Sequence, residues 1–151
     1  MKGRFTGKYE LVPIPKAECK RRGLPCHWWS RPLFDFKLDL ADPLTWHRGD
    51  GFEAQPCITF VTDGGSIPNL IQIIPAFDKF RYPASYGFHD SAYKKHLWWT
   101  RNSVTQPFTK TRLTFSEANS LLHDMLLDEG AWEATANTVY CGVQGFGWLA
   151  W

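Results

Sequence analysis

The residues with the clearest chemical potential are His89, Asp90 and Tyr93, which lie within one short segment of the chain. On a helix, His89 and Tyr93 are one turn apart and share a face, whereas Asp90 points about 100° away. A histidine can take a proton from water near neutral pH, a carboxylate can hold a cation, and a tyrosine hydroxyl can orient a third group. The alternative interpretation is a hydrogen-bonded core histidine next to a surface aspartate.

Two helices are expected to position these residues. The first covers Ala84 to about His96. The second runs from Thr114 to about Asp128, because Thr114 and Glu117 fit a capping box in which each side chain accepts the other residue's backbone N–H. This second helix carries Asn119, and we expect it to face the helix that carries His89.

The remaining chain predicts an α+β fold, with a β-rich N-terminal half and a helical C-terminal half built around a central antiparallel helix pair. Alternating or β-branched apolar residues predict strands, and helical spacing predicts a short early helix and a last long one. The predicted strands are Lys8 to Ile14, Leu33 to Leu40 and Gln55 to Val61, the helices are Asn69 to Ile74 and Ala131 to about Gln144, and residues 97 to 113 are predicted to form a long loop.

The composition is that of a water-soluble globular chain. The 151 residues are 44% hydrophobic and 21% charged, which fits a single domain over residues 1–151. No apolar run approaches the roughly 18 residues that a transmembrane helix needs, and no signal peptide is evident, so we expect a cytoplasmic protein. The four cysteines form no C-x-x-C pair and are interpreted as reduced thiols, with a Cys19–Cys26 disulfide as the alternative.

Charge is unevenly distributed along the chain. Residues 1–25 hold seven Lys/Arg and two Glu, whereas residues 113–151 hold five Asp/Glu and no Lys or Arg. The two ends are therefore complementary and could attract one another within the chain or between subunits of an oligomer. The basic stretch over residues 91–113 is interpreted as a solvated surface loop ahead of a phosphate-binding one, which makes a nucleic-acid partner unlikely.

Three motifs carry a family resemblance over roughly residues 52–147. In this sequence they read Thr62-Asp63-Gly64-Gly65-Ser66-Ile67-Pro68, His89-Asp90-Ser91-Ala92-Tyr93 and Ala118-Asn119. The chain resembles a family of small bacteriophage and prophage proteins of unknown function, whose hallmarks are T-D-x-x-S-I-P, H-D-x-x-Y and a helix with an Ala-Asp pair. The resemblance implies a host-cytoplasmic or virion location and another phage protein as partner. Asn119 replaces the acidic residue of the third motif by its amide.

The same pattern of H-D-x-x-Y and a facing helix is similar to the active site of secreted and viral phospholipases of the A-two type. That resemblance implies His89 as the base that activates water, Asp90 as a calcium ligand and Tyr93 as a supporting hydrogen-bond donor. Asn119 falls where an aspartate steadies the histidine in those enzymes. An amide can orient a histidine but cannot stabilise an imidazolium as a carboxylate does, so we expect weaker catalysis.

The segment Asp63 to Ser66 supplies the remaining candidate site residues. Asp63 could be a second calcium ligand, and Gly64 and Gly65 offer conformational freedom and backbone carbonyls for the same ion. Ser66 could belong to the site beside His89. The alternative is that Asp63 is a turn residue and Ser66 a helix cap.

Two functions remain open from the sequence. One is a phage-derived, calcium-dependent lipid ester hydrolase with phospholipid as substrate. The other is a non-enzymatic virion component or host-interaction protein, in which the same polar cluster braces two helices. An accessible His89 would favour the hydrolase, and a buried, fully hydrogen-bonded His89 would favour the brace.

Overall fold

A computed structural model describes residues 2–25, 32–57, 59–62 and 81–151. The described elements are β1 (Arg4–Thr6), β2 (Tyr9–Pro13), α1 (Lys16–Arg21), β3 (Phe34–Leu38), β4 (Thr45–His47), β5 (Glu53–Pro56), β6 (Phe60–Thr62), α2 (Pro83–Lys95), β7 (Leu97–Arg101), β8 (Thr109–Arg112), α3 (Phe115–Glu129), α4 (Glu133–Phe146) and the short 3₁₀ helix η3 (Gly147–Leu149). Strands lie mostly in the N-terminal half and long helices in the C-terminal half, so the predicted α+β fold is confirmed. None of the described helices is long and apolar enough to cross a membrane.

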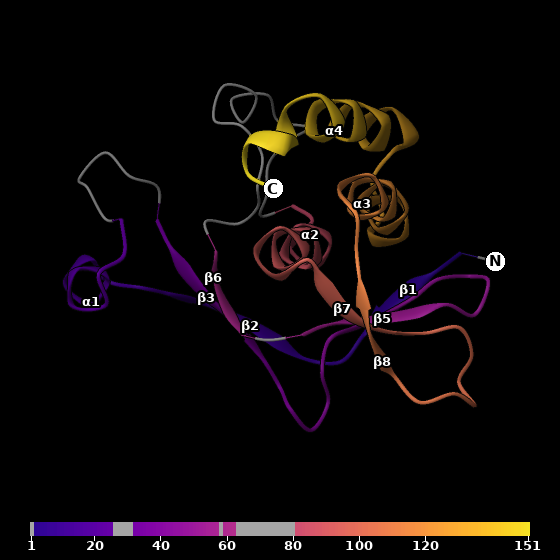
Figure 1. Cartoon of the computed structure of the whole chain (residues 1–151), viewed down its shortest axis with the longest axis horizontal. Coiled ribbons are helices and arrows are strands. Elements are labelled where there is room, and N and C mark those ends of the chain that lie inside the picture. The colour runs from indigo at the N-terminus through magenta and orange to yellow at the C-terminus, as the bar shows by residue number, and fades with distance from the viewer. Residues whose placement is uncertain (1, 26–31, 58, 63–80) are drawn as a thin grey trace.

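The strands form two antiparallel sheets. One has five strands in the order β1-β4-β5-β7-β8, and the other has three in the order β2-β3-β6. Figure 1 shows both sheets on one side of α2 and α3, with α4 on the far side of this helix pair. The helix pair is therefore the middle layer of the described structure.

Helices α2 and α3 run antiparallel, as the sequence predicted. At one end, the carboxylate of Glu129 near the end of α3 accepts hydrogen bonds from the backbone N–H groups of Ala84 (3.1 Å) and Ser85 (2.9 Å) at the start of α2. Toward the other end, Asn119 in the first half of α3 accepts from Tyr93 in the last turn of α2 at 2.8 Å. The Glu129 carboxylate thus caps α2 from a neighbouring helix, since α2 has no side-chain cap of its own.

The start and end of α3 follow local sequence signals. Both hydrogen bonds of the predicted capping box are present, from Glu117 N to the Thr114 hydroxyl and from Thr114 N to the Glu117 carboxylate. The helix ends at Gly130, whose φ of 107° is in the left-handed region that favours glycine. Asn119 is consequently held at a fixed position on a well-defined helix.

The prediction of a long loop over residues 97–113 is wrong. Much of this stretch is the hairpin β7–β8, which completes the five-stranded sheet. Trp98 is fully buried against the helices, whereas Lys110 lies over the ring of Trp99, 5.3 Å from its centroid. Aromatic and β-branched residues favour strands, but the run of basic side chains, which tends to indicate solvent exposure, obscured this signal.

The single strand predicted over Gln55 to Val61 is also wrong. Its first part belongs to β5, where Pro56 pairs with Trp98, and its last part belongs to β6, where Phe60 pairs with Phe36. The chain therefore passes from one sheet to the other within this apolar segment. The predicted helix Asn69 to Ile74 lies outside the described residues.

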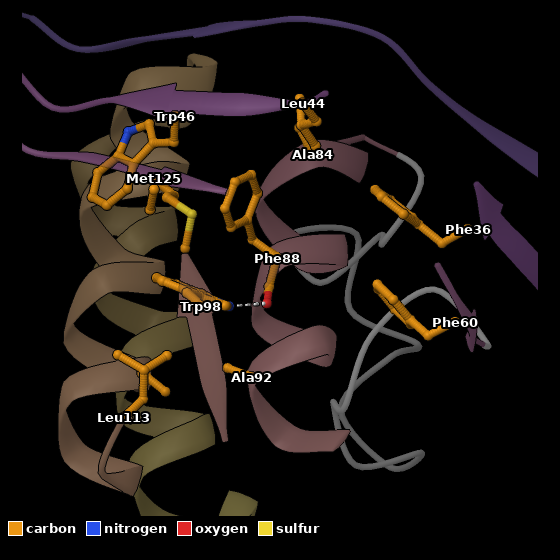
Figure 2. Packing of buried hydrophobic residues seen from close by; sticks show 12 residues of the cluster. Phe36, Leu44, Trp46, Phe60, Ala84, Phe88, Ala92, Trp98, Leu113 and Met125 are labelled. Atoms are coloured by element: carbon orange, nitrogen blue, oxygen red, sulfur yellow. Dashed lines mark hydrogen bonds between the residues drawn. The ribbon is translucent and has the colours of Figure 1, made fainter. Parts of the chain in front are cut away.

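The main core lies between α2 and the sheets (Figure 2). Phe88 of α2 packs edge-on against Trp98, with ring centroids 5.2 Å apart, and the Trp98 indole N–H donates to the Phe88 carbonyl at 3.3 Å. A Cβ atom at Gly87 would lie 2.2 Å from the Phe36 ring, so this glycine permits close approach of α2 to the smaller sheet. These contacts fix the position and rotation of α2, which carries His89, relative to the sheets.

Among the cysteines, the expectation of reduced thiols is wrong for Cys19, which is disulfide-bonded. The described cysteines that are free are Cys57 and Cys141. Cys26, the alternative disulfide partner named from the sequence, lies outside the described residues.

Candidate functional site

The candidate site lies at the interface of α2 and α3, where His89 and Tyr93 point from α2 toward Asn119. His89 and Asn119 have no exposed surface, and Tyr93 is 5% exposed. Helix α2 is buried because strands of both sheets pack against it and α3 packs alongside it. The structure therefore brings the three predicted catalytic residues together.

Asn119 connects three side chains through its amide group. Its Oδ1 lies 2.8 Å from His89 Nε2 and accepts the Tyr93 hydroxyl at 2.8 Å, while its Nδ2 donates to Gln144 Oε1 at 3.0 Å. Because the Nδ2 group is occupied by an acceptor and Oδ1 by the Tyr93 donor, the amide has only one orientation that satisfies all its partners.

This arrangement assigns the proton on neutral His89. Oδ1 of Asn119 is an acceptor, so Nε2 of His89 carries the hydrogen and Nδ1 keeps its lone pair. Nδ1 is buried and has no hydrogen-bond partner among the described residues. Buried polar atoms without a partner are rare and typically have a functional or solvent-related cause.

Burial also controls the titration of the site. Desolvation lowers the pKa of His89 to about 4, and the hydrogen bond to Asn119 opposes this shift only in part. Burial raises the pKa of the Tyr93 hydroxyl, so Tyr93 acts as a hydrogen-bond donor to Asn119 at neutral pH. His89 is therefore neutral near pH 7.

Asp90 follows His89 on α2 but does not join the Asn119 network. Asp90 is 4% exposed, and Lys94 Nζ lies 4.0 Å from its Oδ2 atom. A buried carboxylate next to His89 has the oxygen chemistry that calcium prefers. No group of three His, Cys, Asp or Glu residues that could hold a metal is present in the described part of the chain.

The other predicted ligands and site residues belong to one segment. Asp63, Gly64, Gly65 and Ser66 lie outside the described residues. Any fit of the site to calcium therefore depends on Asp63 as well as on Asp90.

Helix α4 and η3 contribute two residues that the sequence analysis missed. Gln144 accepts from Asn119, and a Cβ atom at Gly147 would lie 2.2 Å from the Tyr93 hydroxyl. Helical spacing was the signal that could have identified Gln144. It follows the buried Ala136 by eight positions, which places its polar side chain on the side of α4 that packs on α3. The candidate site is thus built from three helices rather than two.

The aromatic end of the chain lies against this site. Trp151 packs edge-on against Tyr93, with ring centroids 5.1 Å apart, and stacks on His96 at 4.1 Å. In contrast, Trp148 and Leu149 are largely exposed. The C-terminal segment docks on its own helices through Trp151, in line with its apolar composition.

Comparison with known proteins adds no identification: no protein-family model, curated protein or solved structure matches this chain.

Proposed function

We propose that this chain is a phage-derived hydrolase that cleaves phospholipid ester bonds with the help of calcium. The observation that supports this proposal is the geometry at Asn119, whose Oδ1 accepts from both His89 and Tyr93. This geometry leaves the lone pair of His89 Nδ1 without a protein partner in the described structure. It is the arrangement that the phospholipase resemblance implies, with an amide in place of a carboxylate.

In the proposed reaction, His89 Nδ1 accepts a proton from water as the water oxygen attacks the ester carbonyl carbon. The protonated imidazole then returns this proton to the departing alcohol oxygen. Asn119 and Tyr93 hold the ring so that Nδ1 keeps one direction. If Asp90 and Asp63 hold calcium, the ion would stabilise the negative charge that develops on the ester carbonyl oxygen.

Two features of the site predict slow turnover. The neutral Asn119 amide gives little stabilisation to the imidazolium that forms during proton transfer. His89 also has no exposed surface, so a substrate reaches Nδ1 only after the site opens, which adds a conformational step to each cycle.

The complete burial of His89 and Asn119 favours the second candidate function, a non-enzymatic phage virion component or host-interaction protein. In that case the hydrogen bonds from Asn119 to His89, Tyr93 and Gln144 serve only to join α2, α3 and α4. The brace accounts for burial, but it leaves the buried Nδ1 of His89 without a role. We therefore place the hydrolase first.

The two functions are separated by fatty-acid release from phospholipid vesicles, measured with calcium and with a chelator. The hydrolase predicts release by the wild-type protein in calcium and background release by His89→Ala. His123→Ala is the matched control, because His123 also precedes an aspartate, Asp124, but bonds Asn137 Oδ1 at 2.7 Å near the surface of α3 and α4. Background release by every protein in both conditions would reject the hydrolase and leave the brace.

A further inference from the structure

The five-stranded sheet has a second face, which points away from the helices. Phe5, Trp46 and Ala54 point toward the helices and pack in the core. Side chains alternate along a strand, so their neighbours Thr6, His47 and Glu53 point to the opposite face. This outer face carries a cluster of polar residues that takes no part in the His89 site.

The cluster is a chain of hydrogen bonds from a hydroxyl to an imidazole to a carboxylate. Thr6 Oγ1 lies 2.6 Å from His47 Nε2, and His47 Nδ1 lies 2.6 Å from Glu53 Oε1. The three residues come from the adjacent strands β1, β4 and β5. His47 and Glu53 are direct cross-strand partners, so the sheet itself sets their separation.

The neighbouring residues fix the role of each member. Arg101, the cross-strand partner of Glu53 on β7, donates from its Nε to Glu53 Oε2. Burial of Glu53 acts to raise its pKa, but the hydrogen bonds from Arg101 and His47 outweigh it and hold the pKa below its usual value. An ionised carboxylate only accepts hydrogen bonds, so Nδ1 of neutral His47 carries the proton and Nε2 is free to accept from the Thr6 hydroxyl.

Exposure increases along the cluster in the order that nucleophilic catalysis requires. The Glu53 side chain is 5% exposed, the His47 side chain is 25% exposed, and Thr6 is exposed. The nucleophile candidate is therefore outermost, the base lies beneath it, and the orienting carboxylate is innermost. A hydroxyl, a base and a third group that orients the base, each within hydrogen-bond reach of the next, form the general pattern of an activated nucleophile.

From this geometry we propose that Thr6, His47 and Glu53 form a second active site, which transfers the acyl group of small carboxylic esters. Thr6 Oγ attacks the ester carbonyl carbon while His47 Nε2 takes the hydroxyl proton. The bond to the alcohol oxygen breaks, His47 returns the proton to that oxygen, and an acyl-Thr6 ester remains. Water then attacks this ester by the same route and releases the carboxylic acid, which restores the hydroxyl of Thr6.

The substrate class follows from the position of Thr6. Its hydroxyl stands on an exposed sheet face and not in the buried helix layer that holds His89, so it can meet a small, unhindered acyl group directly. The two sites lie on opposite sides of the sheet and share no residue. Activity at Thr6 therefore does not depend on the lipid hydrolase proposed for His89.

The test uses p-nitrophenyl acetate and the full-length chain, with mass spectrometry of its peptides to locate acetyl groups. We expect acetylation of the hydroxyl at position 6 in the wild-type protein and in Thr6→Ser, and none at this position in Thr6→Ala. His47→Gln removes the base and should slow acetylation of Thr6 by about 100-fold.

Thr109→Ala is the matched control, because Thr109 is an exposed strand hydroxyl that bonds a backbone carbonyl and no histidine. In the wild-type protein, acetylation of Thr109 should stay at the level of other surface hydroxyls. The Thr109→Ala substitution should not change the acetylation of Thr6. Thermal melting of each variant checks that the sheet is folded. The proposal is overturned if Thr6 of the folded wild-type protein is not acetylated, or if folded His47→Gln is acetylated at the wild-type rate.

Discussion

Asn119 Oδ1 and His89 Nε2 are 2.8 Å apart across the interface of α2 and α3, and both residues are fully buried. This contact fixes which nitrogen of His89 carries the hydrogen, because Asn119 already donates its own Nδ2 group to Gln144. The proton arrangement suits a general base, but burial lowers the pKa of His89 to about 4, and the hydrogen bond to the neutral Asn119 amide offsets this shift only in part.

Replacing the neutral amide by a carboxylate should increase hydrolysis. In Asn119→Asp, a charged acceptor faces His89, and rotation of the Gln144 amide allows it to donate to the second carboxylate oxygen. A hydrogen bond to a charged group is worth about 1 to 2 kcal/mol more than a neutral one, which corresponds to roughly tenfold in rate. Fatty-acid release and the NMR titration of His89 measure the rate and the pKa, and we expect both to rise.

Asn119→Leu is the control for this substitution, because it keeps a side chain of similar size without an acceptor. It should abolish release and leave the His89 pKa low. If Asn119→Asp raises the His89 pKa but release stays at background, the network has no catalytic role.

Buried, neutral His89 should make the protein less stable as the pH falls. In the unfolded chain the histidine takes up a proton near pH 6.5, whereas in the folded protein it does so only near pH 4. Its contribution to stability is therefore full above pH 6.5 and is lost progressively as the pH falls toward 4. The loss amounts to about 3 kcal/mol.

Urea unfolding at several pH values measures this dependence, with His89→Gln as the comparison. The difference in free energy of unfolding between wild type and His89→Gln should shrink as the pH falls from 6.5 to 4. Parallel curves over this range would mean that His89 titrates normally and is not buried as described.

Two glycines near the end of the chain give a matched pair of substitutions. Gly147→Ala places a Cβ atom 2.2 Å from the Tyr93 hydroxyl, whereas Gly145→Ala meets nothing within 4 Å. Overpacking at Gly147 should cost about 1 to 3 kcal/mol of stability and displace Tyr93 from Asn119. Gly145→Ala lies within α4 and should stabilise the helix by up to about 1 kcal/mol.

Thermal unfolding measures both glycine variants, and tyrosine NMR signals report the Tyr93 hydroxyl. Equal melting temperatures for the two variants would contradict the close packing of η3 against Tyr93.

The helices were predictable because their signals are local. The capping box at Thr114 and the glycine at 130 define α3, and the one-turn spacing of His89 and Tyr93 places both on the face that meets Asn119. These features depend on residues a few positions apart, which sequence spacing reveals directly.

The rest depends on contacts between distant segments. Gln144 follows Asn119 by 25 positions, and Arg101 follows Glu53 by 48 positions, so only the fold brings each pair into contact. The β7–β8 hairpin was missed because its outer face carries the basic residues Arg101, Lys110 and Arg112, while only Trp98 and Thr100 in these two strands are buried. Local charge indicated solvent exposure on one face and concealed the strand.

The most direct test of the central claim is the initial rate of fatty-acid release from phospholipid vesicles in calcium, compared between wild type and His89→Gln. The glutamine variant retains a polar side chain at the α2–α3 interface but has no imidazole. The account predicts calcium-dependent release by the wild-type protein and a rate at least about 100-fold lower for His89→Gln, as expected for loss of a general base. Equal rates for the two folded proteins would contradict it.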